Sequence, residues 1–402
     1  MKHETGQGGT EVFPANWQET GTAEIDRLIG GSSLGTPAAK SLRERAPAEA
    51  AQAILGRANT LGRGPFAIGI EILPLELSGV ITDHQGKIHD RRRWPLTSMD
   101  VDSVVKHVAV VAKDLVATAL GLDLPDPSIG IGLQLGGPVN AHTGTVIRYE
   151  NNPTDPVILK GARPWRWENE KLAERIERET GCRTVLQNDT AALAAVEQKF
   201  GAGQEHSTYA VILVRDGVGC NVVMENRLLP GPWELGHIIV WPDGRKCECG
   251  LVGDIESQAG RRAIRAVVRE EAGWVDDPDW QRAVDLALED GTRADKALRA
   301  FELAGEAIGR GIAKLVTLLN PTCVVIYAPH ELIEPTAGNK RVTDAFMSAV
   351  EKFRRQTYPP QNQCRLLTKR EQPTDGARGA ALIALSQLFS IPLAPTSPNW
   401  SA

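Results

Sequence analysis

The sequence has few cysteines, no long apolar run and no excess of basic charge. Its six cysteines in 402 residues are too few for a disulfide framework and fit a reducing compartment. No eighteen consecutive residues are apolar, and the start, MKHETGQGGTEVF, lacks the basic and then apolar character of a signal peptide. Residues 1–65 carry seven basic and seven acidic side chains, so they have no basic bias of the kind that nucleic acid attracts. We therefore expect a cytoplasmic protein without a membrane segment.

The first 65 residues differ in composition and sequence pattern from the rest of the chain. Residues 1–21 are polar and rich in glycine, and we expect them to be disordered. Residues 22–65 contain three short helical patterns, with Pro37 and Pro47 at positions that suit a first helical turn. This segment is either a unit that binds DNA or a helical extension that packs on the body or on a partner subunit. It has no tight glycine turn before an exposed helix and no wing hairpin after it.

A β-rich pattern begins at Phe66. Residues 66–94 alternate apolar and polar side chains, with DHQG at 83–86 as a turn, and a long helix with an apolar face follows over 101–121. Strands and helices then alternate, and a second hairpin that starts near Tyr209 begins the same order again. The sequence therefore predicts a duplicated α/β architecture with a cleft between its halves.

The predicted lobes divide the chain unequally. We place the small α/β lobe in residues 66–187 together with 376–395, and the large α/β lobe in residues 188–375. A polar stretch rich in tryptophan and proline, residues 151–168, interrupts the pattern of the first lobe.

A short stretch near the middle of the chain gathers histidine, cysteines and carboxylates. It reads ELGH at 234–237 and CECGLVGDIE at 247–256. Four of its side chains are of the types that can bind one tetrahedral zinc ion: His237, Cys247, Cys249 and Asp254. The flanking Glu234 and Glu256 are then free to face another ligand. Because each carboxylate can accept two hydrogen bonds from neighbouring hydroxyls, the stretch predicts a zinc-organised pocket for a sugar.

Several motifs together resemble one known family. The ELGH and CECGLVGDIE segments are similar to a histidine and cysteine signature of the ROK family (repressors, open reading frames and sugar kinases). The segments GGPVNAHTGTV, LQNDTAALAA, LLNPTCVVIYA and DGARGAALIAL resemble further family motifs in the same order, so the likeness runs from about Phe66 to Ile391. The resemblance implies a two-domain, actin-like and ribonuclease-H-like fold and a homodimer or homotetramer.

The resemblance also implies roles for individual residues. Asn188 would hydrogen-bond sugar hydroxyls, and Asp189 would be the general base if the protein is a kinase. Asn188 before a helix can also be read as a plain helix cap. The remaining sugar-binding residues implied by the family are Gly137, Glu234, His237 and Glu256. His237 would bind zinc through one ring nitrogen and the sugar through the other, so that the metal fixes its tautomer.

Two departures affect this pocket. Asp254 stands where the family has a third cysteine, so either a His-Cys-Cys-Asp zinc site or a site without zinc is consistent with the sequence. The loop from Gly231 to Glu234 is shorter than usual in the family, which predicts a reshaped pocket rim.

The segments that correspond to the family's nucleotide site lack most of the glycines that bind phosphate in the family kinases. The family kinases use D-x-G-G-T where this chain reads EILPL at 71–75, and proline there removes an N–H donor. The second phosphate loop, G-T-G-x-G-G-G in the family, reads RDGVGCN at 215–221 and keeps only Gly217 and Gly219 as weak cofactor-binding candidates. A third element reads YAP at 327–329. We therefore do not expect ATP and magnesium to bind.

The sugar and zinc motifs are present, whereas the nucleotide motifs are not, and three functions are consistent with this difference. The sequence favours a non-kinase sugar sensor, a sugar-responsive transcriptional regulator with DNA contacted through the N-terminal segment. An ATP-dependent sugar or cyclitol kinase with a divergent nucleotide loop is the alternative. An enzyme that reuses the sugar pocket for other chemistry is the third.

Overall fold

The structure is a computed structural model. It describes residues 65–121, 129–150, 165–231, 233–273, 279–358 and 363–393. The expected disorder of residues 1–21 and the expected helices of residues 22–65 lie outside this range, apart from Pro65. Among the described residues, no helix is long and apolar enough to cross a membrane.

The first sheet has five strands in the order β3-β2-β1-β4-β8. Its first three strands form an antiparallel meander, and the last two run parallel to β1. The predicted turn at 83–86 is present, with the Gly86 N–H donating to the Asp83 carbonyl at 2.8 Å. The strands are β1 (Phe66–Leu73), β2 (Glu76–Asp83), β3 (Ile88–Pro95), β4 (Ile129–Leu135) and β8 (Thr184–Asn188).

Helices cover both faces of this sheet. α4 (Val101–Gly121) packs on β1 and β2, and α5 (Leu172–Thr180) packs beside α4. α13 (Asp375–Phe389) lies on β1 and β4, where Gly69 and Gly132 leave room for its backbone. A Cβ atom at Gly69 would lie 1.7 Å from the Ala377 carbonyl oxygen, and one at Gly132 would lie 1.9 Å from that of Ala380. Glycine is therefore required at this sheet–helix contact.

A small antiparallel sheet flanks this lobe. It consists of β5 (Val139–Asn140), β6 (Thr145–Glu150) and β7 (Arg166–Glu170). Residues 166–168 belong to the Trp- and Pro-rich stretch, in which the sequence pattern indicated no strand. Of the five β7 side chains only Trp167 is fully buried, so the strand lacks the alternation that marks a half-buried strand.

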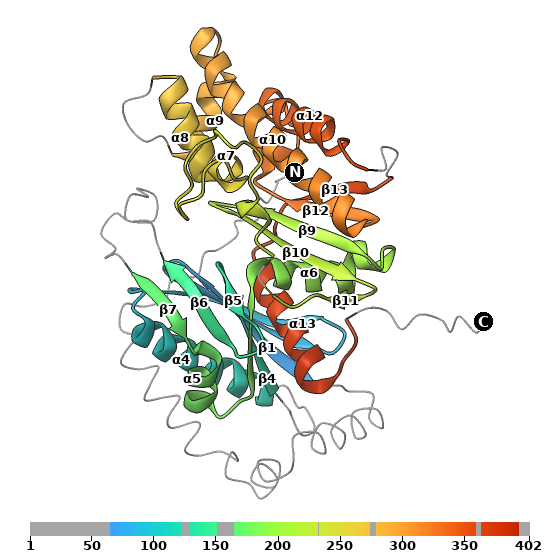
Figure 1. The fold of residues 1–402 in the computed structure, drawn as a ribbon. Helices are drawn as coiled ribbons and strands as arrows, with labels where there is room; N and C mark the ends of the chain where they lie inside the picture. Colours follow the sequence, from blue (N-terminus) through green and yellow to red (C-terminus); the bar gives the residue numbers. More distant parts are fainter. Residues whose placement is uncertain are drawn as a thin grey trace, which may run out of the picture.

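The second sheet repeats the topology of the first, with the order β11-β10-β9-β12-β13. β9, β10 and β11 form an antiparallel meander, and β12 and β13 run parallel to β9. The expected duplication of an α/β unit is therefore visible as two sheets with the same strand order (Figure 1). The strands are β9 (Tyr209–Val214), β10 (Val218–Met224), β11 (Arg227–Leu228), β12 (Cys323–Tyr327) and β13 (Arg365–Lys369).

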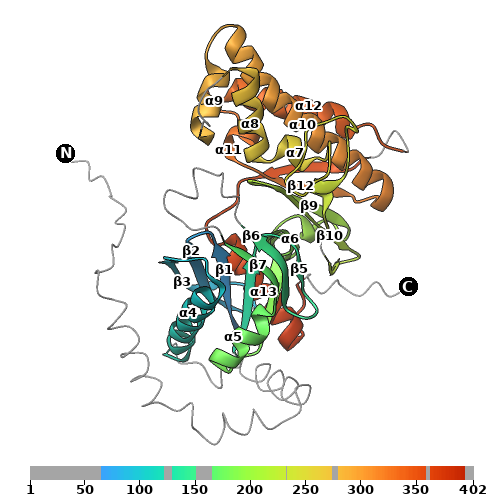
Figure 2. The same cartoon turned by 60° about the vertical axis from the view of Figure 1, so that its left-hand side comes forward.

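Helices form the outer layer of the second lobe (Figure 2). The 28-residue α10 (Thr292–Leu319) packs along α12 (Lys340–Arg354). The shorter elements are η1 (Ala202–Gln204), η2 (Leu235–His237), α7 (Glu256–Ala259), α8 (Arg261–Glu271), α9 (Trp280–Leu288) and α11 (His330–Ile333).

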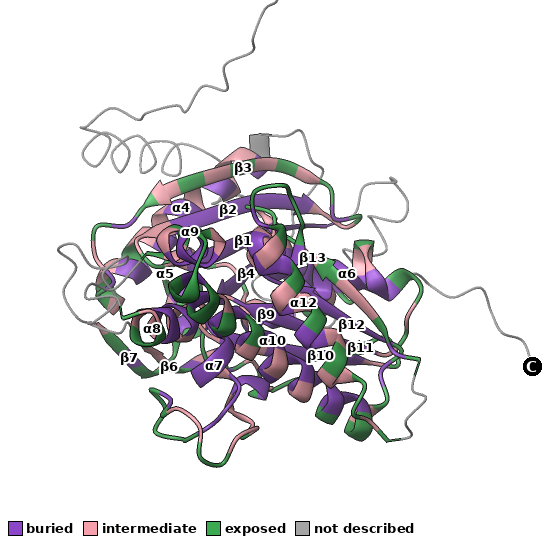
Figure 3. Cartoon of the chain, turned by 90° about the horizontal axis from the view of Figure 1, so that it is seen from above, coloured by how far each residue is buried: buried purple, intermediate pink, exposed green. Residues whose placement is uncertain are grey.

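α6 (Asp189–Phe200) joins the two lobes. It contacts α13, β8 of the first sheet, and β9 and β10 of the second sheet. Residues 190–198 are all buried, and this explains why the helix is rich in alanine and has no polar face. Seen from above, the inner strands of the two sheets are buried, whereas the edge strand β3 and the outer helices carry exposed residues (Figure 3). The N-terminus of α6 therefore opens at the junction of the lobes.

Candidate functional site

Asn188 ends β8 and caps α6. Its side-chain oxygen accepts hydrogen bonds from the Ala191 backbone N–H at 2.9 Å and from the Thr190 hydroxyl at 3.1 Å. The interpretation of Asn188 as a helix cap is therefore correct. The cap uses only the oxygen, and among the described residues no group accepts from the amide nitrogen, so its two N–H donors are available to a ligand.

Asp189 is the first residue of α6. Its Oδ1 accepts from the Thr190 backbone N–H at 2.8 Å, and its Oδ2 lies 3.9 Å from Nη1 of Arg215. Burial raises the pKa of Asp189, and the positive charge of Arg215 opposes that rise. The carboxylate is thus held at the helix N-terminus with a guanidinium beside it.

Arg215 links segments that are far apart in the sequence. It lies in the turn between β9 and β10, and its Nε donates to Glu371 Oε2 at 3.0 Å, with a second, shorter contact from Nη2 to Oε1. Nη2 also lies 3.3 Å from Oε1 of Glu71, on β1 of the other lobe. Burial raises the pKa of Glu71 to about 7, although Arg215 lowers it. We call Glu71, Asp189, Arg215 and Glu371 the Arg215 cluster; the sequence pattern did not indicate it.

The two glycines kept in the second phosphate loop pack against candidate sugar-binding groups. A Cβ atom at Gly217 would lie 2.3 Å from Glu256 Oε2, and the next residue, Val218, donates its N–H to that oxygen at 2.9 Å. A Cβ atom at Gly219 would lie 2.7 Å from Cγ2 of Thr190. A Cβ atom at either position would therefore displace the Glu256 or the Thr190 side chain, so both glycines have a packing role whether or not a nucleotide binds.

His237 presents its two ring nitrogens to different groups. Nδ1 lies 3.0 Å from Asp254 Oδ2, whereas Nε2 lies 3.9 Å from Glu234 Oε2. Burial opposes protonation of the ring, but Asp254 and the nearby Glu256 and Glu234 raise the pKa of His237 overall. Burial also raises the pKa of Glu234, and His237 lowers it.

The four predicted metal ligands come together in space. One ligand atom from each residue lies within 4.8 Å of the others, for His237, Cys247, Cys249 and Asp254. Sγ of Cys247 lies 3.9 Å from Nδ1 of His237, and Sγ of Cys249 lies 3.5 Å from Oδ2 of Asp254. One imidazole nitrogen, two sulfurs and one carboxylate oxygen are a donor set that suits tetrahedral zinc.

Backbone turns shape the metal-ligand loop. Gly250 and Gly253 have positive φ values of 98° and 74°, a conformation that favours glycine. A Cβ atom at Gly253 would lie 1.4 Å from the Trp241 carbonyl oxygen. Asp254 is fully buried, and its Oδ1 accepts from the Ser257 backbone N–H at 2.9 Å. The loop therefore fixes the carboxylate before any ion binds.

An aromatic cluster lies near the carboxylates of Asp189 and Glu71. The ring centroids of Tyr149 and Trp165 are 4.6 Å apart, and those of Tyr149 and Trp167 are 5.4 Å apart. Burial raises the pKa of Tyr149, and the charge of Asp189 adds to that rise. The sequence offered only the high density of aromatic residues as a signal for this cluster.

Gly137 has a structural explanation of its own. Its φ of 83° is in the left-handed region, and a Cβ atom there would lie 2.8 Å from the Arg148 carbonyl oxygen. The neighbouring Gly136 is close to Asp189, because a Cβ atom at Gly136 would lie 3.7 Å from Asp189 Oδ2. The β4–β5 turn is therefore part of the site.

The repeated strand order, with a polar cluster at the junction of two lobes, defines a two-lobed, actin-like α/β protein. A model of the ROK family matches residues 67–387. The chain belongs to the ROK family, which confirms the resemblance and the fold class expected from the sequence.

Both enzymes and repressors are among the relatives. A glucokinase from Thermotoga maritima is 28% identical over 276 residues, which cover 64% of this chain and 80% of the relative. A xylose repressor from Caldicellulosiruptor bescii is 26% identical over 217 residues, half of each chain. The crystal structure of a ROK transcriptional regulator, a homolog of the E. coli MLC protein, superimposes with a TM-score of 0.64 at 21% identity and covers 93% of this chain and 98% of its own. These identities do not separate a regulator from a kinase.

Proposed function

We propose that this protein is a sugar-responsive transcriptional regulator of the ROK family that does not phosphorylate its ligand. The observation that carries the proposal is the ion pair between Arg215 and Glu71. These residues stand in the two segments that correspond to the phosphate loops of the family kinases. Here the segments bind each other, with Arg215 also paired to Glu371.

The charge balance of the Arg215 cluster disfavours a nucleotide. Three carboxylates surround one guanidinium, so the phosphates of ATP would meet net negative charge. The β1–β2 turn supports the same conclusion, because Pro74 has no N–H and the Leu75 N–H is directed at the Met99 sulfur at 3.5 Å. Leu75 has a φ of 62°, so a bulky side chain occupies a backbone conformation that suits glycine.

The sugar-binding groups are retained at the lobe junction. In this proposal the amide of Asn188 and the carboxylates of Asp189, Glu234 and Glu256 bind sugar hydroxyls, with Gly137 shaping the adjacent turn. Nε2 of His237 faces Glu234 and would complete the set. Because both lobes contribute residues, sugar binding would favour one relative position of the lobes.

The donor set of His237, Cys247, Cys249 and Asp254 fits zinc. A bound zinc ion would supply a fixed positive charge and hold Nδ1 of His237 unprotonated. The imidazole would then present Nε2–H to the sugar as a hydrogen-bond donor. The loop of residues 247–254, with its two left-handed glycines, supports this role because it brings Cys247, Cys249 and Asp254 close to His237.

DNA binding and oligomerisation complete the proposal. We assign DNA binding to residues 22–65, because this segment precedes residues 67–387, which the ROK family model matches. We propose a cytoplasmic homodimer or homotetramer, since a dimer would present two such segments to one operator.

The direct test combines titration with a gel shift. Isothermal titration of the full-length protein should show binding of a neutral sugar and no binding of ATP–magnesium. A gel shift on the DNA upstream of its own gene, at low salt, should change when that sugar is added. Failure of the full-length protein to shift this DNA would refute the regulator assignment, and ATP binding would refute the loss of the nucleotide site.

A kinase is the second candidate, favoured by one observation. Asp189 stands at the position of the general base, with the neighbouring Asn188 amide available to the same ligand. The glucokinase relatives match over most of their length. Sugar-dependent ADP release from ATP would establish a kinase or cyclitol kinase. Turnover of the sugar without ATP would instead indicate an enzyme that reuses the pocket for other chemistry.

A further inference from the structure

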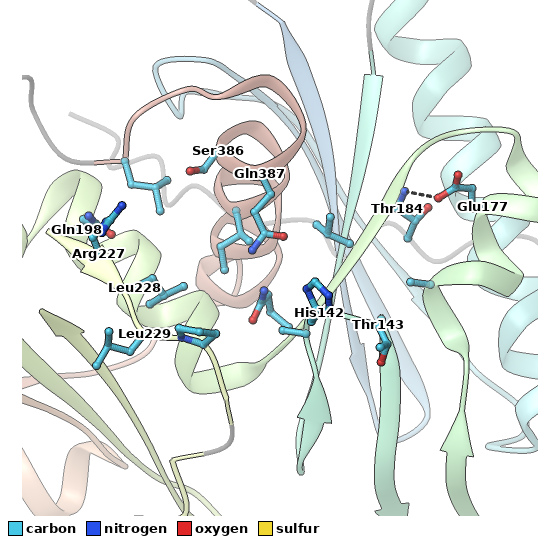
Figure 4. A pocket seen from close by; sticks show the side chains of 18 of the residues that line it. His142, Thr143, Glu177, Thr184, Gln198, Arg227, Leu228, Leu229, Ser386 and Gln387 are labelled. Atoms are coloured by element: carbon cyan, nitrogen blue, oxygen red, sulfur yellow. Dashed lines mark hydrogen bonds between the residues drawn. The ribbon is translucent and has the colours of Figure 1, made fainter. Parts of the chain in front are cut away.

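A cavity lies apart from the candidate sugar site. It has a volume of about 960 Å³, which is in the range of small-molecule sites. The wall on one side comes from β11 and the end of α6, and the opposite wall comes from the β5–β6 turn and α5 (Figure 4). β8 and α13 close the cavity between these walls. A molecule in this cavity would therefore touch both lobes.

β8 and α6 contribute residues both to the cavity and to the sugar site, but the residues differ between the two sites. Gln187 of β8 lines the cavity, whereas the next residue, Asn188, caps α6 beside the sugar-binding carboxylates. α6 begins at Asp189 and carries Gln198 into the cavity nine residues later, about 14 Å along the helix axis. The two sites are thus separate and connected by rigid elements.

One buried amide in this cavity has an oxygen without a protein partner. Gln198 is 2% exposed, and its Nε2 donates to the Asn226 backbone carbonyl, which fixes the orientation of the amide. Its Oε1 accepts no hydrogen bond within the described part of the chain. Gln187 also lines the cavity and is 6% exposed. Because a buried amide oxygen is normally hydrogen-bonded, the unpaired Oε1 of Gln198 indicates a polar occupant.

The charges around the cavity leave one cation available. Of the two α5 glutamates, Glu174 is paired with Arg178 at 2.8 Å, and Glu177 accepts from the Thr184 backbone N–H at 3.2 Å. The guanidinium of Arg227, on β11, forms no ion pair with any described residue. The cavity therefore offers the N–H donors of one guanidinium that has no ion-pair partner among the described residues, with Glu177 as the carboxylate that lacks a cationic partner.

Further hydrogen-bonding groups line the same cavity. Figure 4 shows Ser386 and Gln387 reaching into the cavity from α13 and His142 facing them from the β5–β6 turn. Hydroxyl, amide and imidazole groups are suited to sugar hydroxyls, and a guanidinium is suited to a carboxylate or phosphate.

We propose that this cavity is a second binding site, for a hydroxylated small molecule with one anionic group. A sugar phosphate and a sugar acid share this chemistry. The anionic group binds Arg227, and the hydroxyls bind Gln187, Gln387 and Ser386. Its ligand differs from that of the first site, where the carboxylates of the Arg215 cluster repel an anion.

The experiment is isothermal titration of the full-length protein with glucose 6-phosphate, gluconate and glucose as separate probes. Arg227→Gln removes the cation from an exposed position and should weaken the anionic probe about tenfold or more. Arg91→Gln removes the same charge from the exposed edge strand β3 and should have no effect. Gln387→Ala tests the amide contact, again at an exposed position, and should also weaken binding.

The sugar-site variant Glu256→Gln separates the two sites. It should leave binding of the anionic probe unchanged. Loss of that binding in Glu256→Gln with retention in Arg227→Gln would place the probe in the first site and overturn the proposal. Equal weakening by Arg227→Gln and Arg91→Gln, or no binding of either anionic probe at about 1 mM, would overturn it as well. A difference between glucose 6-phosphate and gluconate identifies the anionic group.

Discussion

Nδ1 of His237 lies 3.0 Å from Oδ2 of Asp254, while its other ring nitrogen faces Glu234. One imidazole therefore connects the candidate metal ligands to the candidate sugar ligands. Because a ring nitrogen that binds a metal cannot carry a proton, the state of the metal site determines what Nε2 offers the sugar. We therefore expect metal content and sugar affinity to depend on each other.

The first prediction concerns this dependence. Cys249→Ser should abolish zinc binding and weaken sugar binding, because His237 loses the ion that orients it. Metal analysis of the purified variant and titration with the sugar measure the two effects. Cys182→Ser is the matched control, since that thiol lies outside the metal cluster, and it should keep both properties. Full sugar affinity in a zinc-free Cys249→Ser protein would contradict the prediction.

The pH dependence of stability should report on Glu71. Its pKa rises from 4.5 to about 7 on folding because the carboxyl group is buried. The resulting stabilisation is fully present below pH 4.5 and is lost as the pH rises through 7. Wild-type protein should therefore lose on the order of 3 kcal/mol relative to Glu71→Gln between these values.

Urea denaturation at several pH values measures this difference. Other carboxyl groups also titrate in this range, so the quantity to compare is the difference between wild type and Glu71→Gln. Parallel curves for the two proteins would show that Glu71 is ionised in the folded state throughout.

A third prediction separates the cap from the sugar role of Asn188. Asn188→Ser retains an oxygen that can cap α6, so the free energy of unfolding should change by less than about 1 kcal/mol. It removes the amide N–H donors, so sugar affinity should fall about tenfold. Asn188→Ala should lose both, as measured by denaturation and titration. Unchanged sugar affinity in the serine variant would assign Asn188 to the cap only.

Gly217→Ala should affect the sugar pocket through Glu256. The added methyl group would lie 2.3 Å from Glu256 Oε2, so the carboxylate must move away from the Val218 N–H. Sugar affinity should fall while the protein still folds. Gly338→Ala is the control, because the nearest atom to its added Cβ is a side-chain oxygen 3.9 Å away. Equal affinity of the two variants would show that Gly217 has no role in positioning Glu256.

The sequence predicted the features that depend on local pattern. The β1–β3 meander, the α6 cap and the clustering of the four candidate metal ligands all come from short segments whose spacing reflects their geometry. β13 was not predicted, because its five residues show no regular alternation of burial. The Arg215 cluster was not predicted either, since Arg215 is separated from Glu71 by 144 positions and from Glu371 by 156. Only the fold brings such residues together.

The contact of α13 with the first sheet limits which sequences this fold can accept. Any side chain at Gly69 or Gly132 would overlap a backbone carbonyl of the helix, and neither partner is a flexible atom that can turn aside. Saturation mutagenesis should therefore recover only glycine at these two positions. At exposed positions of β3 such as Arg91, the same library should recover most polar residues. One sheet would then contain an edge strand that accepts many substitutions and central strands with positions that accept only glycine.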